Sequence, residues 1–172
     1  MFVVFFDAYL SLQFVWMKKV LFVCLGNICR SPMAEGVFNK LAKERGLENL
    51  FFSDSAGTAG YHIGELPDLR TRKVCELKHT PLNHRGRKIN KDDLQEYDLL
   101  LAMDQANYFD ILNQLAVSDE EKHKVRLLRS FEQGALEGEV PDPYYGTMED
   151  FHNVYTMLEK ACSALLDSLT KK

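Results

Sequence analysis

The chain has 172 residues, of which 46% are hydrophobic and 27% are charged, and its formal net charge is −4. This length and ordinary balance predict one globular domain with a single core. The small negative charge gives no reason to expect a nucleic acid partner. Four cysteines are too few for a disulfide framework in a chain of this length, so we expect a reducing, cytoplasmic location.

The first sixteen residues, MFVVFFDAYLSLQFVW, differ from the rest of the chain because thirteen of them are apolar or aromatic. A signal peptide carries its positive charge before the apolar run, whereas Lys18 and Lys19 follow this one. The run is also shorter than a membrane span of about 20 residues, so we expect no membrane partner. We interpret residues 1–16 as an apolar extension upstream of a native start at Met17, with a segment packed on the domain or on a partner as the alternative. Residues 17–172 then form the functional domain.

Strands and helices are expected to alternate along the rest of the chain. Residues 19–23 form a continuous apolar, β-branched run, which predicts a buried strand. Ser31 and Pro32 predict the start of the following helix, as its N-cap and first helical residue, and Gly46 predicts its end. Further patterns predict strands over 50–53, 99–103 and 125–128, and helices over 68–77, after Asn90, from Asp104 to about 115, and from about 147 to 169.

This alternation predicts an α/β fold, a single-domain three-layer sandwich with a four-stranded parallel sheet of the flavodoxin or Rossmann-like kind. Ligands of such sheets bind at the carboxyl ends of the strands. Two sequence motifs follow strands there, CLGNICRS after the first strand and PDPYYG after the fourth. We therefore expect both motifs at one site.

The CLGNICRS motif joins a buried strand to a helix N-terminus, where backbone N–H groups and the helix dipole favour an anion. Gly26 and Asn27 readily adopt the left-handed backbone angles that fold such a loop inward. Arg30 adds a planar fork that can hold two oxygens of a phosphate. Because positive surroundings favour the thiolate, we expect Cys24 to be ionised near neutral pH, beneath the phosphate and placed for in-line attack on phosphorus. Ser31 can donate a hydrogen bond to that sulfur and make it a better leaving group.

The sequence also resembles a known family. The stretch VLFVCLGNICRSPMAEGVF, together with the distal DPYYG, is similar to the low-molecular-weight protein tyrosine phosphatases, and the similarity extends through DSAGT, NHRGRKI and LLLAMDQAN. The resemblance implies hydrolysis of phosphotyrosine and small aryl phosphates through a phosphocysteine intermediate, with no metal and no cofactor. It implies a phosphotyrosine-containing protein as partner, a tyrosine kinase being one candidate, and inorganic phosphate or other oxyanions as ligands of the loop.

The resemblance also implies roles for individual residues. Cys24 is the expected nucleophile and Asp142 the expected general acid, a role that the chemistry supports because a phenolate leaves poorly unless it is protonated. Tyr144 and Tyr145 are expected to wall the pocket, and Tyr61 to stand at its rim. The hydrogen bond expected between His84 and Asn27 would support the loop. The expected phosphate-binding residues are Leu25, Gly26, Asn27, Ile28, Cys29, Arg30 and Ser31.

Cys29 has a second expected role, as a redox guard of Cys24. The two cysteines are five residues apart in a loop that curls around one anion, so their sulfurs should lie near each other. A disulfide with Cys29 would capture the sulfenic acid of Cys24 before irreversible oxidation. The alternative is that Cys29 only fills space at the start of the helix.

Three other functions compete with this interpretation. An arsenate reductase of the same fold needs a downstream cysteine pair, whereas this chain offers only Cys75 and Cys162, each on a predicted helix. A related protein-arginine phosphatase tends to carry Thr where Ile28 stands, and an isoleucine methyl suits a flat phenol better than a guanidinium. A binding module without catalysis would not need the cysteine, the arginine and Asp142 together.

Overall fold

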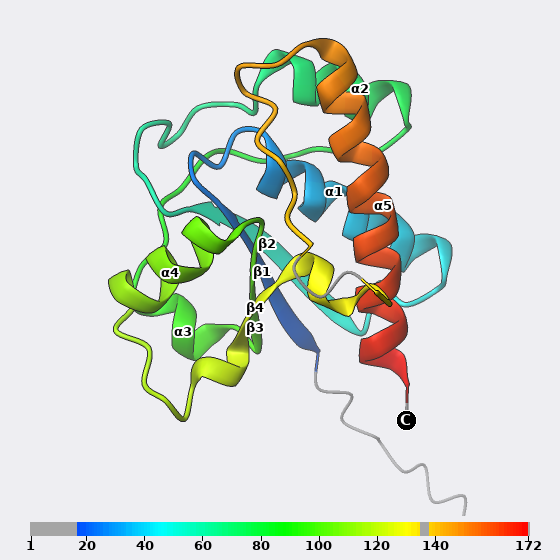
Figure 1. The fold of residues 1–172 in the computed structure, drawn as a ribbon. Coiled ribbons are helices and arrows are strands. Elements are labelled where there is room, and N and C mark those ends of the chain that lie inside the picture. Colours follow the sequence, from blue (N-terminus) through cyan, green and yellow to red (C-terminus); the bar gives the residue numbers. More distant parts are fainter. Residues whose placement is uncertain (1–16, 135–137, 172) are drawn as a thin grey trace, which may run out of the picture.

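The structure is a computed structural model, and it describes residues 17–134 and 138–171, so that the extension over residues 1–16 lies outside it. Four strands form one parallel sheet, as the sequence predicts, and their order in it is β2-β1-β3-β4 (Figure 1). The strands are β1 (Lys18–Cys24), β2 (Phe51–Gly57), β3 (Leu99–Ala102) and β4 (Val125–Leu127). In the register of the sheet, Cys24 lies opposite Gly57 and Val23 lies opposite Ala102. The carboxyl ends of β1, β2 and β3 therefore lie at one edge of the sheet.

Helices cover both faces of the sheet, which completes the predicted three-layer sandwich (Figure 1). Helices α1 and α5 pack together on one face, and α4 packs on β3 and β4 on the other. The helices are α1 (Arg30–Glu44), α2 (Leu69–Leu77), α3 (Asp93–Glu96), α4 (Gln105–Gln114) and α5 (Met148–Thr170), with 3-10 turns η1 (Lys122–Lys124) and η2 (Leu128–Phe131). No helix within the described ranges is long and apolar enough to cross a membrane.

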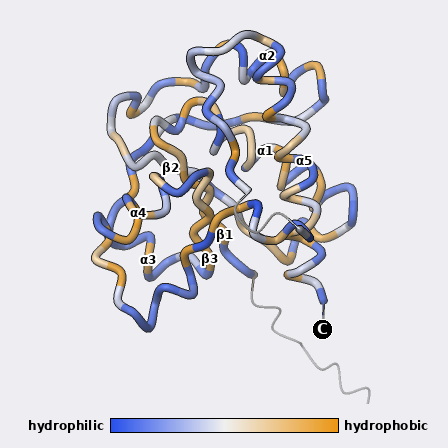
Figure 2. The backbone as a smooth tube through the Cα atoms, in the orientation of Figure 1, coloured by the Kyte–Doolittle hydropathy of each residue, from blue (hydrophilic) through white to orange (hydrophobic). Residues whose placement is uncertain are grey.

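Strand β1 lies at the centre of the core because both of its faces are buried. Phe22 belongs to the hydrophobic cluster under α1 and α5, and Leu21 and Val23 belong to the cluster under α4. Figure 2 shows hydrophobic colour along β1 and β3 in the middle of the molecule. This double burial explains why the strand appears in the sequence as an uninterrupted apolar run rather than an alternating one.

Three predicted boundaries were wrong. Helix α1 begins two residues early, at Arg30, with Cys29 at the cap position and no capping hydrogen bond from its side chain, so Ser31 is not the N-cap. Strand β2 continues four residues beyond the predicted 50–53, because Asp54 and Ser55 find partners for their polar side chains inside the structure. Helix α3 begins at Asp93, and the Asn90 side chain instead accepts the Asp92 backbone N–H.

The start of the last helix agrees with the predicted position, at about residue 147. Thr147 and Asp150 form a capping box at the start of α5. Six apolar or aromatic side chains on the inward face of this helix are buried: Phe151, Val154, Tyr155, Leu158, Cys162 and Leu165. Before this helix, the Val140 N–H donates to the Met103 carbonyl at 2.8 Å, which brings the PDPYYG segment beside the end of β3.

Buried thiols make the fold sensitive to alkaline pH. Burial raises the pKa of Cys75 from 9.0 to about 12, and burial with nearby negative charges raises the pKa of Cys29 to about 12. Burial also raises the pKa of Cys162. The folded state therefore holds these protons where the unfolded state loses them. The stability that neutral thiols provide is complete below pH 9.0 and falls as the pH rises toward 12.

We expect the free energy of unfolding to fall above pH 9.0 by about 1.4 kcal/mol per pH unit for each such thiol. Urea unfolding in the presence of a thiol reductant, measured from pH 7 to pH 11, checks this. Cys75→Ala removes one of the titrating groups, so its stability should decline with a slope that is shallower by one thiol. Equal slopes for the variant and the wild type would contradict the assignment.

Candidate active site

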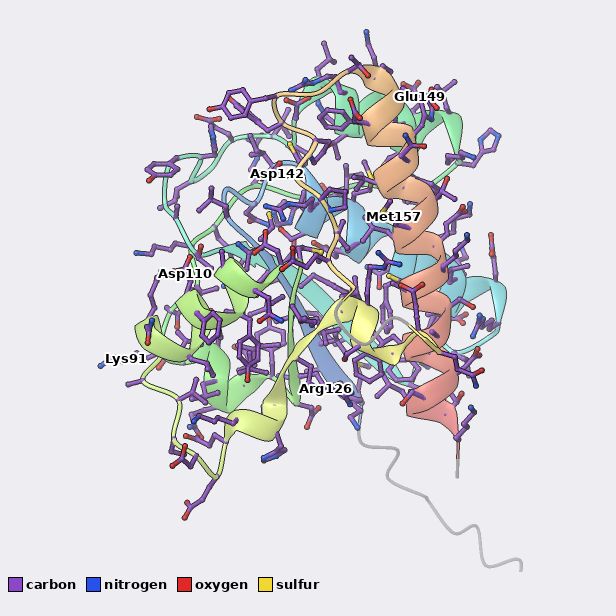
Figure 3. All side chains as sticks on the ribbon, in the orientation of Figure 1. Lys91, Asp110, Arg126, Asp142, Glu149 and Met157 are labelled. Atoms are coloured by element: carbon purple, nitrogen blue, oxygen red, sulfur yellow. The ribbon has the colours of Figure 1, made fainter. Side chains whose placement is uncertain are left out.

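The predicted phosphate loop lies at the carboxyl edge of the sheet, between β1 and α1. It lines a pocket of about 330 Å³ together with residues from two other segments. Asp142 comes from the loop before α5, which passes over the start of α1 in Figure 3. The lining residues are Cys24, Leu25, Gly26, Ile28, Cys29, Arg30, Tyr61, His62, Asp142, Tyr144 and Tyr145. Of the predicted site residues, only Asn27, Ser31 and His84 lie behind the pocket wall rather than along it.

The sulfur of Cys24 lies at the last position of β1 and accepts hydrogen bonds from the loop. The Asn27 backbone N–H donates to it at 3.3 Å, and the Ser31 hydroxyl lies 3.0 Å away. Because the Asn27 side-chain amide donates to the Ser31 oxygen at 2.9 Å, the proton of Ser31 is free to point at the sulfur. Ser31 therefore uses its hydroxyl on Cys24 instead of capping α1.

Asn27 holds the loop from behind, and its backbone is in the left-handed region, with φ of 56°. Its side-chain N–H groups donate to Ser31 and, at 3.0 Å, to Ser55. Its side-chain oxygen accepts the Arg87 backbone N–H at 2.8 Å and lies 2.9 Å from Nε2 of His84. Since an amide oxygen only accepts, Nε2 of His84 is the donor. All of the capacity of the amide is used, which fixes the orientation of the loop.

Arg30 is the first residue of α1, and its buried guanidinium binds two carboxylates. One terminal nitrogen, Nη1, donates to Asp104 at 2.5 Å and to the Val140 carbonyl at 3.1 Å. The other, Nη2, donates to Asp142 at 2.6 Å. Burial lowers the pKa of Arg30, but the charge of Cys24, the hydrogen bond to Asp104 and the charge of Asp142 outweigh burial and raise it. The group therefore stays charged above the sulfur.

The segment that follows the fourth strand places an acid and two aromatic rings at the mouth of the pocket. Asp142 also accepts the Tyr144 backbone N–H at 3.1 Å, and its side chain is 42% exposed, so water and a substrate can reach it. The rings of Tyr144 and Tyr145 meet edge to face at 5.0 Å, and the exposed ring of Tyr61 also lines the pocket. The exposed rims suit an aromatic group that enters from solvent.

Sequence reasoning missed several residues that support the site. Asp104 was predicted only as a cap of α4; it does cap that helix, accepting the Asn107 N–H, but its other oxygen binds Arg30. The signal for this role was its position directly after β3, at the edge where the loop lies. Glu35 and Ser55 carry no such signal, because Ser55 reaches Glu35 at 2.8 Å only after α1 packs on β2.

Three side chains behind the loop could hold a cation by geometry alone. Ligand atoms of Glu35, Asp54 and His84 all lie within 4.8 Å of one another. The oxygens already have protein partners, however, since Arg87 donates to Asp54 at 2.8 Å and His84 lies 3.1 Å from Glu35. The cluster therefore acts as a hydrogen-bond network behind the loop.

Comparisons with known proteins agree with this geometry. The model of the family described as low molecular weight phosphotyrosine protein phosphatase matches residues 19–172. The low molecular weight phosphotyrosine protein phosphatase of Gallus gallus is 43% identical over 152 residues, which are 87% of this chain and 94% of that protein.

Two solved structures extend the comparison. A protein tyrosine phosphatase from Entamoeba histolytica, crystallised with Hepes in its active site, has a TM-score of 0.83 at 39% identity and covers 88% of this chain and 96% of its own. A Drosophila arginine phosphatase has the same TM-score at 30% identity and covers 90% of this chain and 99% of its own. The fold therefore hosts both substrate classes.

Substitution of Asn27 tests whether the hydrogen bonds of its side chain hold the phosphate loop in shape. Asn27→Gly keeps the left-handed backbone but leaves Nε2 of His84 and the Arg87 N–H without their acceptor, so we expect a loss of about 2–4 kcal/mol in stability and inorganic phosphate binding at least roughly tenfold weaker. Asn27→Ala should lose about 1 kcal/mol more, because a Cβ is unfavourable at this φ.

Urea unfolding and calorimetric titration with phosphate measure both quantities. Exposed Asn39 on α1 serves as the matched control, and Asn39→Ala should change stability by less than about 0.5 kcal/mol. Phosphate binding of wild-type strength in Asn27→Gly would show that the loop holds its shape without this side chain.

Proposed function

The chain belongs to the low molecular weight phosphotyrosine protein phosphatase family, and from that premise we propose that it hydrolyses phosphotyrosine on proteins through a phosphocysteine intermediate on Cys24. The observation that carries the proposal is the convergence of three groups in one pocket. The sulfur of Cys24, the guanidinium of Arg30 and the carboxyl of Asp142 all line it. They supply a nucleophile, a charge for the phosphoryl oxygens and a proton for the leaving group.

In the first step the phosphoryl group binds to the N–H groups of the loop and to Arg30. The Cys24 sulfur attacks phosphorus, an S–P bond forms, and the P–O bond to the phenol breaks. Asp142 gives its proton to the leaving oxygen, so that phenol rather than phenolate departs. Because Arg30 donates to Asp142 and would donate to phosphate, one guanidinium keeps acid and substrate on the same side of the sulfur.

In the second step water hydrolyses the phosphocysteine. The Asp142 carboxylate takes a proton from the water, oxygen bonds to phosphorus, and the S–P bond breaks. The leaving thiolate is stabilised by the Ser31 hydroxyl and the Asn27 N–H, which lie 3.0 Å and 3.3 Å from the sulfur. Every group in the two steps belongs to this chain, so the proposed reaction uses no metal and no cofactor.

The walls of the pocket favour a phenyl ring as the leaving group. Ile28 lines the pocket beside the sulfur, and its side chain is an apolar surface without a group that could pair with a guanidinium. Tyr144, Tyr145 and Tyr61 add aromatic surfaces around the mouth. The Drosophila arginine phosphatase makes phosphoarginine the alternative substrate class. We propose a phosphotyrosine protein as the partner, with a tyrosine kinase as one candidate.

The proposal extends to the setting of the protein. All four cysteines are free and buried, which suits a reducing compartment, and we propose a cytoplasmic location. Residues 17–172 are proposed to form the whole phosphatase domain. The chain expressed from Met17 should then be as active as the chain that includes residues 1–16.

A comparison of rates tests the substrate class. We expect phosphotyrosine peptides to be hydrolysed at least about tenfold faster than phosphoarginine peptides of the same sequence, because an isoleucine methyl crowds the guanidinium. Release of inorganic phosphate measures both rates. Cys24→Ser is the control and should be inactive toward both substrates, since a serine hydroxyl is not ionised near neutral pH. Faster turnover of phosphoarginine would overturn the assignment.

The role of Asp142 is tested by varying the leaving group. Asp142→Asn should slow cleavage of phenyl phosphates with poor leaving groups by roughly 10²–10⁴-fold, the usual range for a lost general acid. The loss should shrink for substrates whose phenolate is already a stable anion. A loss of the same size across the series would show that Asp142 is not the proton donor.

We propose Cys29 as the redox partner of Cys24. Cys29 is buried and lines the same pocket as Cys24. Peroxide would transfer an oxygen to the Cys24 thiolate as its O–O bond breaks. The Cys29 sulfur would then bond to the oxidised sulfur and release water.

Peroxide treatment followed by a thiol reductant tests this protection. The wild type should recover most of its activity, and Cys29→Ser should stay largely inactive because its Cys24 continues to irreversible oxidation states. The control is Cys75→Ser, which changes a cysteine outside the pocket and should recover like the wild type. Equal recovery of Cys29→Ser and the wild type would leave Cys29 with a packing role alone.

A further inference from the structure

Arg70, the second residue of α2, connects that helix to the loop that carries Asp142. Its Nη2 donates to the Tyr144 carbonyl at 2.9 Å, and its Nη1 donates to the Gly146 carbonyl at 3.0 Å. These two carbonyls lie two and four residues beyond Asp142. A planar guanidinium that binds two carbonyls of one turn fixes the position and the orientation of that turn.

The guanidinium of Arg70 is itself held from two sides. Asp68 accepts from its Nε at 3.0 Å and from its Nη2 at 2.9 Å. The guanidinium carbon lies 4.4 Å from the ring centroid of Phe151 on α5. The hydrogen bonds from Arg70 lower the pKa of Asp68, so the pair stays ionised at neutral pH. Arg70 is therefore a rigid support.

Asp68 also ties this support to the phosphate loop, because its backbone N–H donates to the Ile28 carbonyl at 2.8 Å. One short unit, Asp68 with Arg70, thus touches the loop that holds the phosphate and the loop that holds the acid. Within the described part of the chain, Arg30 and Arg70 are the only residues outside the segment 142–146 that hydrogen-bond to it.

The two arginines have different tasks once a phosphoryl group is bound. Phosphate oxygens compete with Asp142 for the guanidinium of Arg30, which weakens the hold of Arg30 on the acid. Asp142 then keeps its bond from the Tyr144 N–H to its other oxygen. Arg70 holds Tyr144 by its carbonyl, so the chain of contacts runs from Arg70 through Tyr144 to the acid.

We propose that Arg70 is a positioning residue for proton transfer: it holds the Asp142 loop at the height above the sulfur from which the carboxyl reaches the leaving oxygen. This inference rests on the proposed function, with Asp142 as the acid. Arg70 touches neither the substrate nor the reacting atoms, and it acts only through the loop. Its loss should thus leave phosphate binding intact and slow the steps in which Asp142 moves a proton.

Steady-state kinetics of Arg70→Gln with a series of aryl phosphates tests the proposal. For poor leaving groups we expect kcat to fall roughly 10-fold to 100-fold, the range for a misplaced catalytic group, with the inhibition constant of inorganic phosphate unchanged within about twofold. The loss should shrink for good leaving groups. Arg70→Lys keeps a charge near Phe151 but cannot bind both carbonyls, so it should lose less and also serves if Arg70→Gln folds poorly.

Arg72 provides the matched control, because it lies on the same helix and donates to the Pro67 carbonyl rather than to the acid loop. Arg72→Gln removes the same charge and should keep kcat within about twofold of the wild type. An equal loss of kcat in both variants would indicate an effect of charge or of helix stability and would overturn the proposal.

A double-mutant cycle separates this inference from the proposed function. If Arg70 acts through Asp142, Arg70→Gln should cost almost nothing further in the Asp142→Asn background. Additive losses, with Asp142→Asn itself showing the leaving-group dependence of a general acid, would overturn the role of Arg70 alone. An Asp142→Asn variant without that dependence would overturn both the acid and its support.

Discussion

The buried guanidinium of Arg30 is the contact on which the arrangement of the site depends. Burying a charged group is unfavourable unless it is paired, and here Asp104 and Asp142 supply the pairing. Asp104 begins α4 at the end of β3, Asp142 belongs to the loop before α5, and Arg30 begins α1. Three segments that are distant in sequence thus meet at one cation, beside the sulfur at the end of β1. Because α1 is packed firmly between α5 and the sheet, the pairing also fixes where the acid lies.

The loop has a second support behind it, which does not touch the pocket. Asn27 accepts an unfavourable backbone angle because its buried amide has partners on all sides: Ser31, Ser55, His84 and the Arg87 N–H. Removing the amide would leave buried polar groups unpaired, so the network resists change as a unit. Arg70, held by Asp68, supports the loop of Asp142 in the same way, by hydrogen bonds to its backbone. The proposed catalytic groups therefore lie on a rigid frame whose contacts also stabilise the fold.

The sequence predicted most of the fold and the centre of the site, and failed where tertiary partners decide. The apolar run of β1, the helical periodicity of α5 and the turn residues between them are local signals, and the alternation of strands and helices that they define predicts the parallel sheet. The N-cap role predicted for Ser31 was wrong, because Ser-Pro is typical of a helix start, whereas the predicted contact of its hydroxyl with the Cys24 sulfur is present at 3.0 Å. Strand β2 was predicted too short because Asp54 and Ser55 are polar, and their partners Arg87 and Glu35 come from other segments. The support from Arg70 could not be predicted, since 74 residues separate it from Tyr144.

The central claim is that Cys24 carries the phosphoryl group between the two steps. The most direct measurement mixes the enzyme with an aryl phosphate, stops the reaction with denaturant within the first turnover, and locates the phosphoryl group by mass spectrometry of the digested chain. We expect one phosphoryl group per chain, attached to sulfur on the peptide that contains Cys24. A phosphoryl group on any other residue, or rapid release of phosphate with no phosphoenzyme at any time, would contradict it.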